Sequence, residues 1–117
     1  MRRVRIVIDA LIQGRIFGKP SQRTASNGNS FVIAKLRTQM ANGEVSFINV
    51  ITFSESAGAA LLALEDGDTA ALAGELKVST FTPKDGAARP SIDLTAHAVL
   101  TEYHVQRKRR AVAEAAE

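Results

Sequence analysis

The sequence predicts an all-β protein, a small five-stranded barrel with one helix between the third and fourth strands. Apolar and polar residues alternate in five segments, as in strands that bury one face. Turn signals stand at Asn42-Gly43 and Asp85-Gly86. One alanine- and leucine-rich segment interrupts the alternation, and 117 residues suffice for a single domain.

The first half of the chain predicts two strands and a hairpin. Residues 3–17 are rich in β-branched and aliphatic residues, and the glycine, proline and polar residues of 18–29 predict a loop after them. Residues 30–38 predict the second strand. The Asn42-Gly43 pair then predicts a tight hairpin, because both residues tolerate the positive φ that such a turn demands.

The second half predicts a third strand, the helix and two further strands. Residues 45–53 alternate, and residues 54–64 favour a helix with Ser54 as its N-cap. Residues 69–81 predict the fourth strand. One face of the fifth strand is predicted to hold Ile92, Leu94, Ala96, Ala98 and Leu100. These elements define a domain over residues 1–101, followed by a short basic helix or tail over 102–117.

This element order is the layout of an OB-fold, a partly open Greek-key barrel. Gly14 and Gly74 lie inside predicted strands, where they fit the sharp bends that close a small barrel. An open α+β sandwich has the same element count and is the alternative architecture.

Charge is unevenly distributed along the chain. The first 43 residues contain eight Lys or Arg and one acid, whereas residues 44–75 contain six acids and no Lys or Arg. The net charge is +3. We expect a basic face suited to a polyanionic partner, the other interpretation being an unevenly charged, solvated surface.

The residue patterns of known enzymes are missing. His97 and His104 lack metal-ligand spacing, and the sequence contains no nucleophile elbow or phosphate-binding glycine loop. Glu65, Asp66 and Asp68 are interpreted as a solvated turn rather than a divalent-ion site. The absence of cysteine excludes thiolate metal sites and disulfides. We expect no catalytic residue, no metal, no cofactor and no membrane partner.

Aromatic and basic residues share the faces of predicted strands. Phe47 and Phe53 have the same parity on the third strand, and Phe81 has that of Lys77 on the fourth. Single-stranded nucleic acid requires such a mixture, because bases stack on rings and cations follow the phosphates. Phenylalanine at strand positions is also common in cores, and parity alone does not decide between the two.

Several short motifs, none of them specific alone, have a characteristic order and spacing. They are Gly14-Arg15-Ile16, Pro20, Asn27-Gly28, the segment from Phe47 to Phe53, Ala57, Gly67-Asp68, Gly74-Glu75-Leu76, Phe81-Thr82 and Asp85-Gly86. Through them the chain resembles the bacterial single-stranded DNA-binding proteins from about residue 4 to residue 100. The resemblance implies an OB-fold that binds single-stranded DNA without sequence preference and forms a homo-oligomer, with a tetramer favoured and a dimer possible.

The resemblance also implies site residues. It places base-stacking rings at Phe47, Phe53 and Phe81. The cations that we assign to the nucleic-acid site are Arg5, Arg15, Lys35, Arg37 and Lys77, followed by Lys84 and Arg89.

The chain departs from the family pattern in three respects, the first being the short hairpin at Asn42-Gly43, which removes length that could contact DNA. It has no tryptophan, so weaker stacking per base is expected. It ends in the basic run 107–110 and an Ala/Glu stretch instead of an acidic tip, so recruitment of replication enzymes through such a tip is not implied. The basic run is either a solvated segment or a source of further phosphate contacts.

We expect a protein that protects single strands during DNA replication, recombination or repair in the cytoplasm, at the nucleoid. The alternatives are a primosome-type OB-fold adaptor that acts through protein contacts, a purely structural oligomerisation module, and a binder of RNA.

Overall fold

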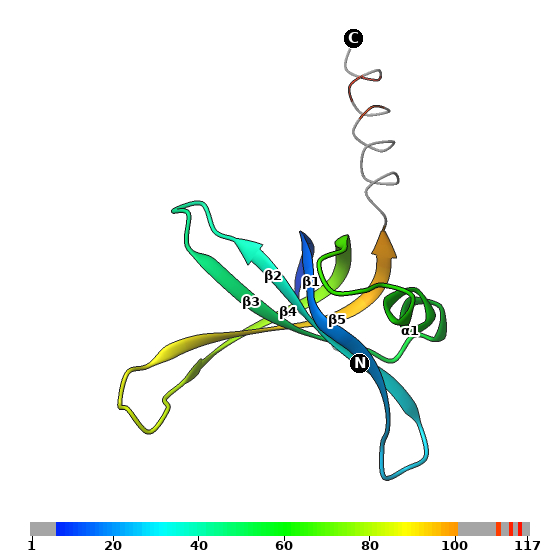
Figure 1. The fold of residues 1–117 in the computed structure, drawn as a ribbon, viewed down its shortest axis with the longest axis horizontal. Helices are drawn as coiled ribbons and strands as arrows, with labels where there is room; N and C mark the ends of the chain where they lie inside the picture. The colour runs from blue at the N-terminus through cyan, green and yellow to red at the C-terminus, as the bar shows by residue number, and fades with distance from the viewer. Residues whose placement is uncertain (1–6, 101–109, 111–112, 114, 116–117) are drawn as a thin grey trace, which may run out of the picture.

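The computed structural model describes residues 7–100, 110, 113 and 115, and it shows a closed five-stranded barrel with one helix (Figure 1). The elements are β1 (Ile8–Thr24), β2 (Ser30–Gln39), β3 (Val45–Thr52), α1 (Glu55–Leu62), β4 (Thr69–Phe81) and β5 (Arg89–Leu100). The predicted barrel, with its helix between the third and fourth strands, is therefore confirmed.

The strands follow one another around the barrel in the order β1-β2-β3-β5-β4, and β4 pairs back to β1. All neighbouring strands are antiparallel except β3 and β5, which are parallel. The helix α1 packs against β1, β2 and β5. This closed arrangement is that of an OB-fold barrel, and it excludes the open sandwich.

The strand β1 is longer than the sequence predicts. Its residues 8–15 pair with β4, and its residues 15–24 pair with β2. The prediction of a loop over residues 18–29 is therefore wrong for residues 18–24, which belong to β1. Gly18 adopts a φ of 75° and the register with β2 shifts between Phe17 and Ser21, so the strand accommodates its glycine and proline as an irregularity instead of ending there.

The core inside the barrel is aliphatic. The predicted alternation of β2 and β3 holds, with one face of each strand turned inward. The cluster of buried residues consists of Ile16, Val32, Leu36, Ile48, Val50, Leu61, Ala70, Leu72, Leu94 and Ala96. It contains no phenylalanine, so the described rings lie outside the barrel.

The predicted face of β5 ends at Ala96, which pairs with Gly74. The preceding residue of β4 pairs with Ala98, so His97 is an inserted residue in β5, a β-bulge. Val99 then packs against the core in place of Ala98. The expectation that the inward face continues through Ala98 is thus wrong, because a bulge reverses the parity of every residue beyond it.

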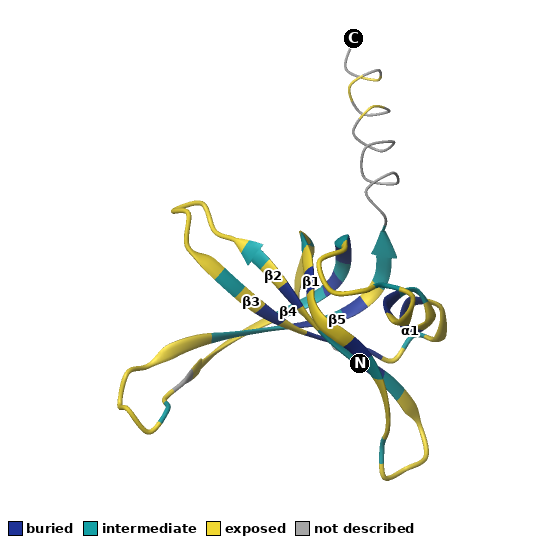
Figure 2. Cartoon of the chain, viewed as in Figure 1, coloured by how far each residue is buried: buried dark blue, intermediate teal, exposed yellow. Residues whose placement is uncertain are grey.

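Three hairpin turns share one construction. Gly28, Gly43 and Gly86 have positive φ, and each donates its N–H to the carbonyl three residues earlier. The Asn or Asp before each glycine accepts a hydrogen bond from the N–H two residues further on. At Asn42-Gly43 only the glycine has positive φ, contrary to the expectation for both residues. The β1–β2 and β4–β5 hairpins extend from the barrel and are largely exposed (Figure 2).

The start of α1 is tied to the sheet. The Ser54 hydroxyl accepts a hydrogen bond from the Ala57 N–H at 3.3 Å, which confirms the predicted N-cap. The buried Thr52 hydroxyl donates to the Ala96 carbonyl at 2.7 Å and accepts from the Ser54 N–H at 3.2 Å. One side chain therefore connects β3, β5 and the first turn of the helix.

The helix ends at Leu62, two residues earlier than predicted. Of the predicted C-terminal helix or tail, only residues 110, 113 and 115 are described, and they are helical and exposed. Within the described residues, no helix has the length and apolar composition needed to cross a membrane.

We expect the Gly74→Ala substitution to lower the free energy of unfolding by about 2 kcal/mol, because a Cβ at this position would collide with the backbone carbonyl oxygen of Thr95. Urea unfolding measures the change. Ser79→Ala, at an exposed position of the same strand, is the control and should change stability by no more than about 0.5 kcal/mol. Equal stability of the two variants would contradict the close approach of β4 and β5.

Candidate nucleic-acid interface

The outer face of β1, β2 and β3 carries side chains in rows set by the pairing register. In one row Arg15 pairs with Arg37, and Arg37 pairs with Phe47. In the next row Phe17 pairs with Lys35, and Lys35 pairs with Asn49. The register therefore brings cations and rings from three strands side by side.

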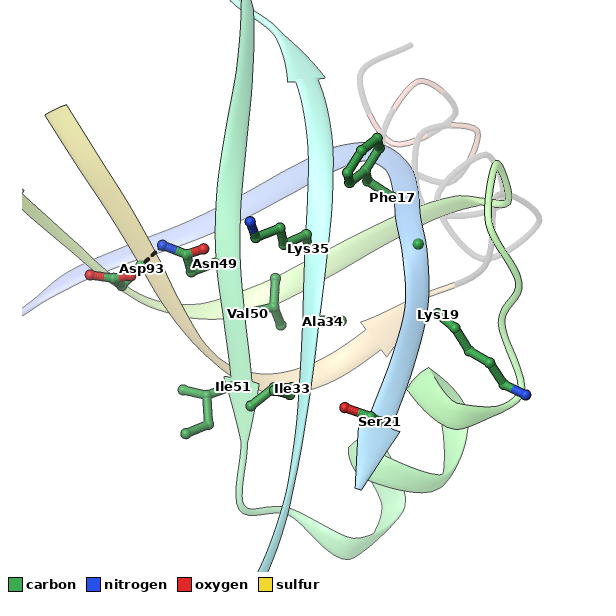
Figure 3. Close-up of a pocket in the computed structure, with 11 residues that line it drawn as sticks. Phe17, Lys19, Ser21, Ile33, Ala34, Lys35, Asn49, Val50, Ile51 and Asp93 are labelled. Carbon is green, nitrogen blue, oxygen red and sulfur yellow. Dashed lines mark hydrogen bonds between the residues drawn. The ribbon is translucent and has the colours of Figure 1, made fainter. Parts of the chain in front are cut away.

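Further along the same face the rows become apolar. Ser21 pairs with Ile33, and Ile33 pairs with Ile51. Beside them lies a groove of about 560 Å³, bordered by Phe17 and Lys35 on one side and by Ile51 on another (Figure 3). Its walls are mainly hydrocarbon, and its rim carries charged and amide groups. Such a surface suits a flat, heterocyclic ligand.

The described phenylalanines form two pairs on the outside of the barrel. The ring centroids of Phe17 and Phe47 are 5.0 Å apart in an edge-to-face arrangement, and those of Phe31 and Phe53 are 5.9 Å apart. Phe17 is 52% exposed, Phe47 45% and Phe53 63%. Rings in the core would be sealed from solvent, so the interpretation of Phe47 and Phe53 as core residues is excluded.

The predicted cations fall into two groups. Arg15, Lys35 and Arg37 are exposed and lie in the rows with the rings. The other group is on β4 and the β4–β5 hairpin: Lys77 pairs with Asp93 in the sheet register, and Lys84 and Arg89 are on the protruding hairpin.

Two of the predicted site residues have side chains that the structure does not describe. Arg5 lies outside the described residues. Phe81 ends β4 with its backbone paired to Arg89, but its side chain lies outside the described part of the chain. The Arg89 guanidinium is 3.1 Å from the Asp85 carboxylate, within the same hairpin.

Phe17 is a candidate site residue that sequence reasoning missed. It was placed at the end of the first strand, next to a predicted loop. Its parity is that of Arg15, a residue already assigned to the site, and this shared parity is the signal that could have identified it.

The acidic turn at residues 65–68 positions the part of β1 that carries Phe17. The Asp66 carboxylate accepts the Gly18 N–H at 2.8 Å. Ile16 is hydrogen-bonded to the backbone of residues 67–68 through both its N–H and its carbonyl. The Asp66 carboxylate thus supports β1, whereas the Asp68 carboxylate accepts the Glu65 N–H within the turn. Among the described residues, no three His, Asp or Glu side chains are grouped so that they could hold a metal ion.

The facing pair of Arg15 and Arg37 places two like charges directly opposite each other on the sheet. Such a pair is destabilising by itself. Neither guanidinium forms an ion pair with a described residue. An anion placed between them would relieve their repulsion, and guanidinium groups suit the geometry of phosphate.

The chain is similar to known proteins over most of its length. Residues 7–102 match the sequence model of the single-strand binding protein family. A solved structure of a small single-stranded DNA-binding protein from Streptomyces coelicolor has 27% sequence identity and a TM-score of 0.65, with 82% of this chain and 94% of that chain covered.

A second similar structure is that of a mitochondrial single-stranded DNA-binding protein from S. cerevisiae. It has 17% identity and a TM-score of 0.66, with 84% of this chain and 97% of that chain covered, and its likeness concerns the fold alone. No curated protein sequence gives a significant match.

Proposed function

Because the chain belongs to the single-strand binding protein family, we propose that it binds and protects single-stranded DNA without requiring a particular sequence. The observation that carries the proposal is the group of exposed cations Arg15, Lys35 and Arg37 beside exposed rings on the outer face of β1, β2 and β3. The family match does not favour the adaptor alternative. It also supports a binding role without catalysis.

The rings supply the first part of the affinity. Bases stack on aromatic side chains with about 1–3 kcal/mol per base, a range established on OB-fold single-strand binding proteins themselves. Phe17 and Phe47 stand at one end of the groove, and Phe31 and Phe53 lie beyond the isoleucine row at its other end. We infer that bases occupy the groove between these two pairs.

The cations supply the second part. Arg15, Lys35 and Arg37 lie along the same rows, where they can follow the phosphates of a bound strand. Every base has a π-face and every nucleotide has a phosphate, so these contacts do not depend on sequence. We propose that Arg5, Lys77, Phe81, Lys84 and Arg89 extend the contact, the last four along β4 and the β4–β5 hairpin.

We further propose that the protein acts as a homo-oligomer, with a tetramer favoured over a dimer. On the outer face of β1, Leu11 is 60% exposed, and such apolar exposure is typical of a surface that a second copy covers. Its cellular role would be the protection of single strands at the nucleoid during replication, recombination and repair.

We expect Phe47→Ala and Phe53→Ala each to weaken binding to a dT oligonucleotide about tenfold, since each removes one stacking ring. Fluorescence anisotropy measures the affinity, and circular dichroism checks the fold. Met40→Ala, at an exposed apolar position in the β2–β3 turn, is the control and should bind normally. Normal binding by a folded Phe53→Ala protein would remove that ring from the site.

Arg37→Gln should reduce the steepness of the salt dependence of DNA binding by about 0.7 per lost phosphate contact, because fewer counterions are released. The slope of log affinity against log salt concentration is the measurement. Phe47→Ala serves as the comparison, since loss of a ring lowers affinity without changing the slope. An unchanged slope for Arg37→Gln would show that this guanidinium does not contact phosphate.

Leu11→Arg should reduce the assembly to smaller species, because it places a charge on the exposed apolar part of β1. Light scattering gives the molar mass, and Met40→Arg provides a matched charge outside β1. A wild-type protein that is monomeric at all concentrations would refute the oligomer, and Leu11→Arg with wild-type mass would place the interface elsewhere.

A further inference from the structure

A carboxylate lies within the face that we assign to a polyanion. Asp93 on β5 pairs with Asn49 of β3 on one side and with Lys77 of β4 on the other. Asn49 in turn pairs with Lys35 of β2. The four side chains therefore form one row across the outer face, with a cation at each end and an amide and a carboxylate between them.

Asn49 and Asp93 are joined by a hydrogen bond. The Asn49 side-chain amide donates to one Asp93 carboxylate oxygen at 3.0 Å, and both residues line the groove (Figure 3). Because this bond engages the amide nitrogen, the amide carbonyl points away from Asp93. Asn49 is exposed and Asp93 is partly exposed, so both present polar atoms to a ligand in the groove.

The position of Asp93 is unfavourable for a phosphate, since like charges repel. The flanking cations Lys35 and Lys77 keep the row positive as a whole, and Lys35 extends toward Asn49 in Figure 3. A strand can therefore place its phosphates near the lysines and turn the edge of a base toward the carboxylate.

The edges of the four bases differ in what they offer to Asn49 and Asp93. The carboxylate and the amide carbonyl are both hydrogen-bond acceptors. Cytosine, adenine and guanine carry an exocyclic amine, which donates to such groups, as in the pairing of Asp or Glu with the cytosine amine. Thymine has no amine: the donor on its pairing edge is the ring N–H, which lies between two carbonyl oxygens that a carboxylate repels.

We propose that Asn49 and Asp93 read the exocyclic amine of a base in the groove, and so shift binding from thymine toward amine-bearing bases. The inference rests on the proposed function and deepens it. Binding still requires no particular sequence, but the affinity depends on which base occupies the groove. The preference comes from one base position per subunit, since the row crosses the groove once.

The test compares the affinities of Asp93→Asn and wild-type protein for dC and dT oligonucleotides of equal length, by fluorescence anisotropy at one salt concentration. Removal of the charge should strengthen binding to both strands. The ratio of dC to dT affinity should fall about fivefold, because the variant no longer discriminates against thymine. Asp9→Asn removes the same charge from β1 outside the groove and should leave the ratio unchanged.

The remaining outcomes are distinct. If Asp93→Asn does not fold, Asn49→Ala provides the same comparison, because it removes the amide carbonyl, and a lower ratio supports the proposal. An unchanged or higher ratio in a folded variant, while the wild-type protein binds both strands, overturns the base reading alone. Failure of the wild-type protein to bind either strand overturns the proposed function and the base reading with it.

Discussion

The small interior of the closed barrel is the constraint on which the rest of the structure depends. Its volume is filled by aliphatic side chains and alanines, and the backbones of β4 and β5 approach so closely at Gly74 that a methyl group would not fit. None of the phenylalanine side chains that the structure describes joins this core. The described rings are therefore on the outside, where they pack in pairs and leave much of their surface to solvent.

The pairing register of β1, β2 and β3 determines which cations and rings are neighbours on the outer face. Arg15, Arg37 and Phe47 are far apart in the sequence and adjacent in the sheet. The acidic turn after α1 holds β1 on both sides of Phe17, through backbone hydrogen bonds to Ile16 and through the Asp66 carboxylate, which accepts from the Gly18 N–H. The same turn thus stabilises β1 and positions the side chain of Phe17 on the binding face.

Local patterns in the sequence predicted most of the fold, including the Ser54 cap and the bounds of β4, because alternation and capping are read from neighbouring residues. The bulge at His97 and the passage of β1 through Gly18 were missed, since both depend on how a partner strand lies alongside. For the same reason, Phe47 and Phe53 were assigned through family resemblance. Phe17 was missed because its strand was predicted to end there, although it shares the parity of Arg15.

The pairing of β1 with β4 affects how the chain reaches this structure. Ile8 pairs with Leu76, so the barrel closes only after most of the sequence is available, whereas the β1–β2, β2–β3 and β4–β5 hairpins join neighbouring segments. Sequence-distant pairing slows folding, and a newly made β1 exposes its apolar residues until β4 arrives. Closure of the ring is accordingly the late step at which an unfinished chain is most prone to aggregate.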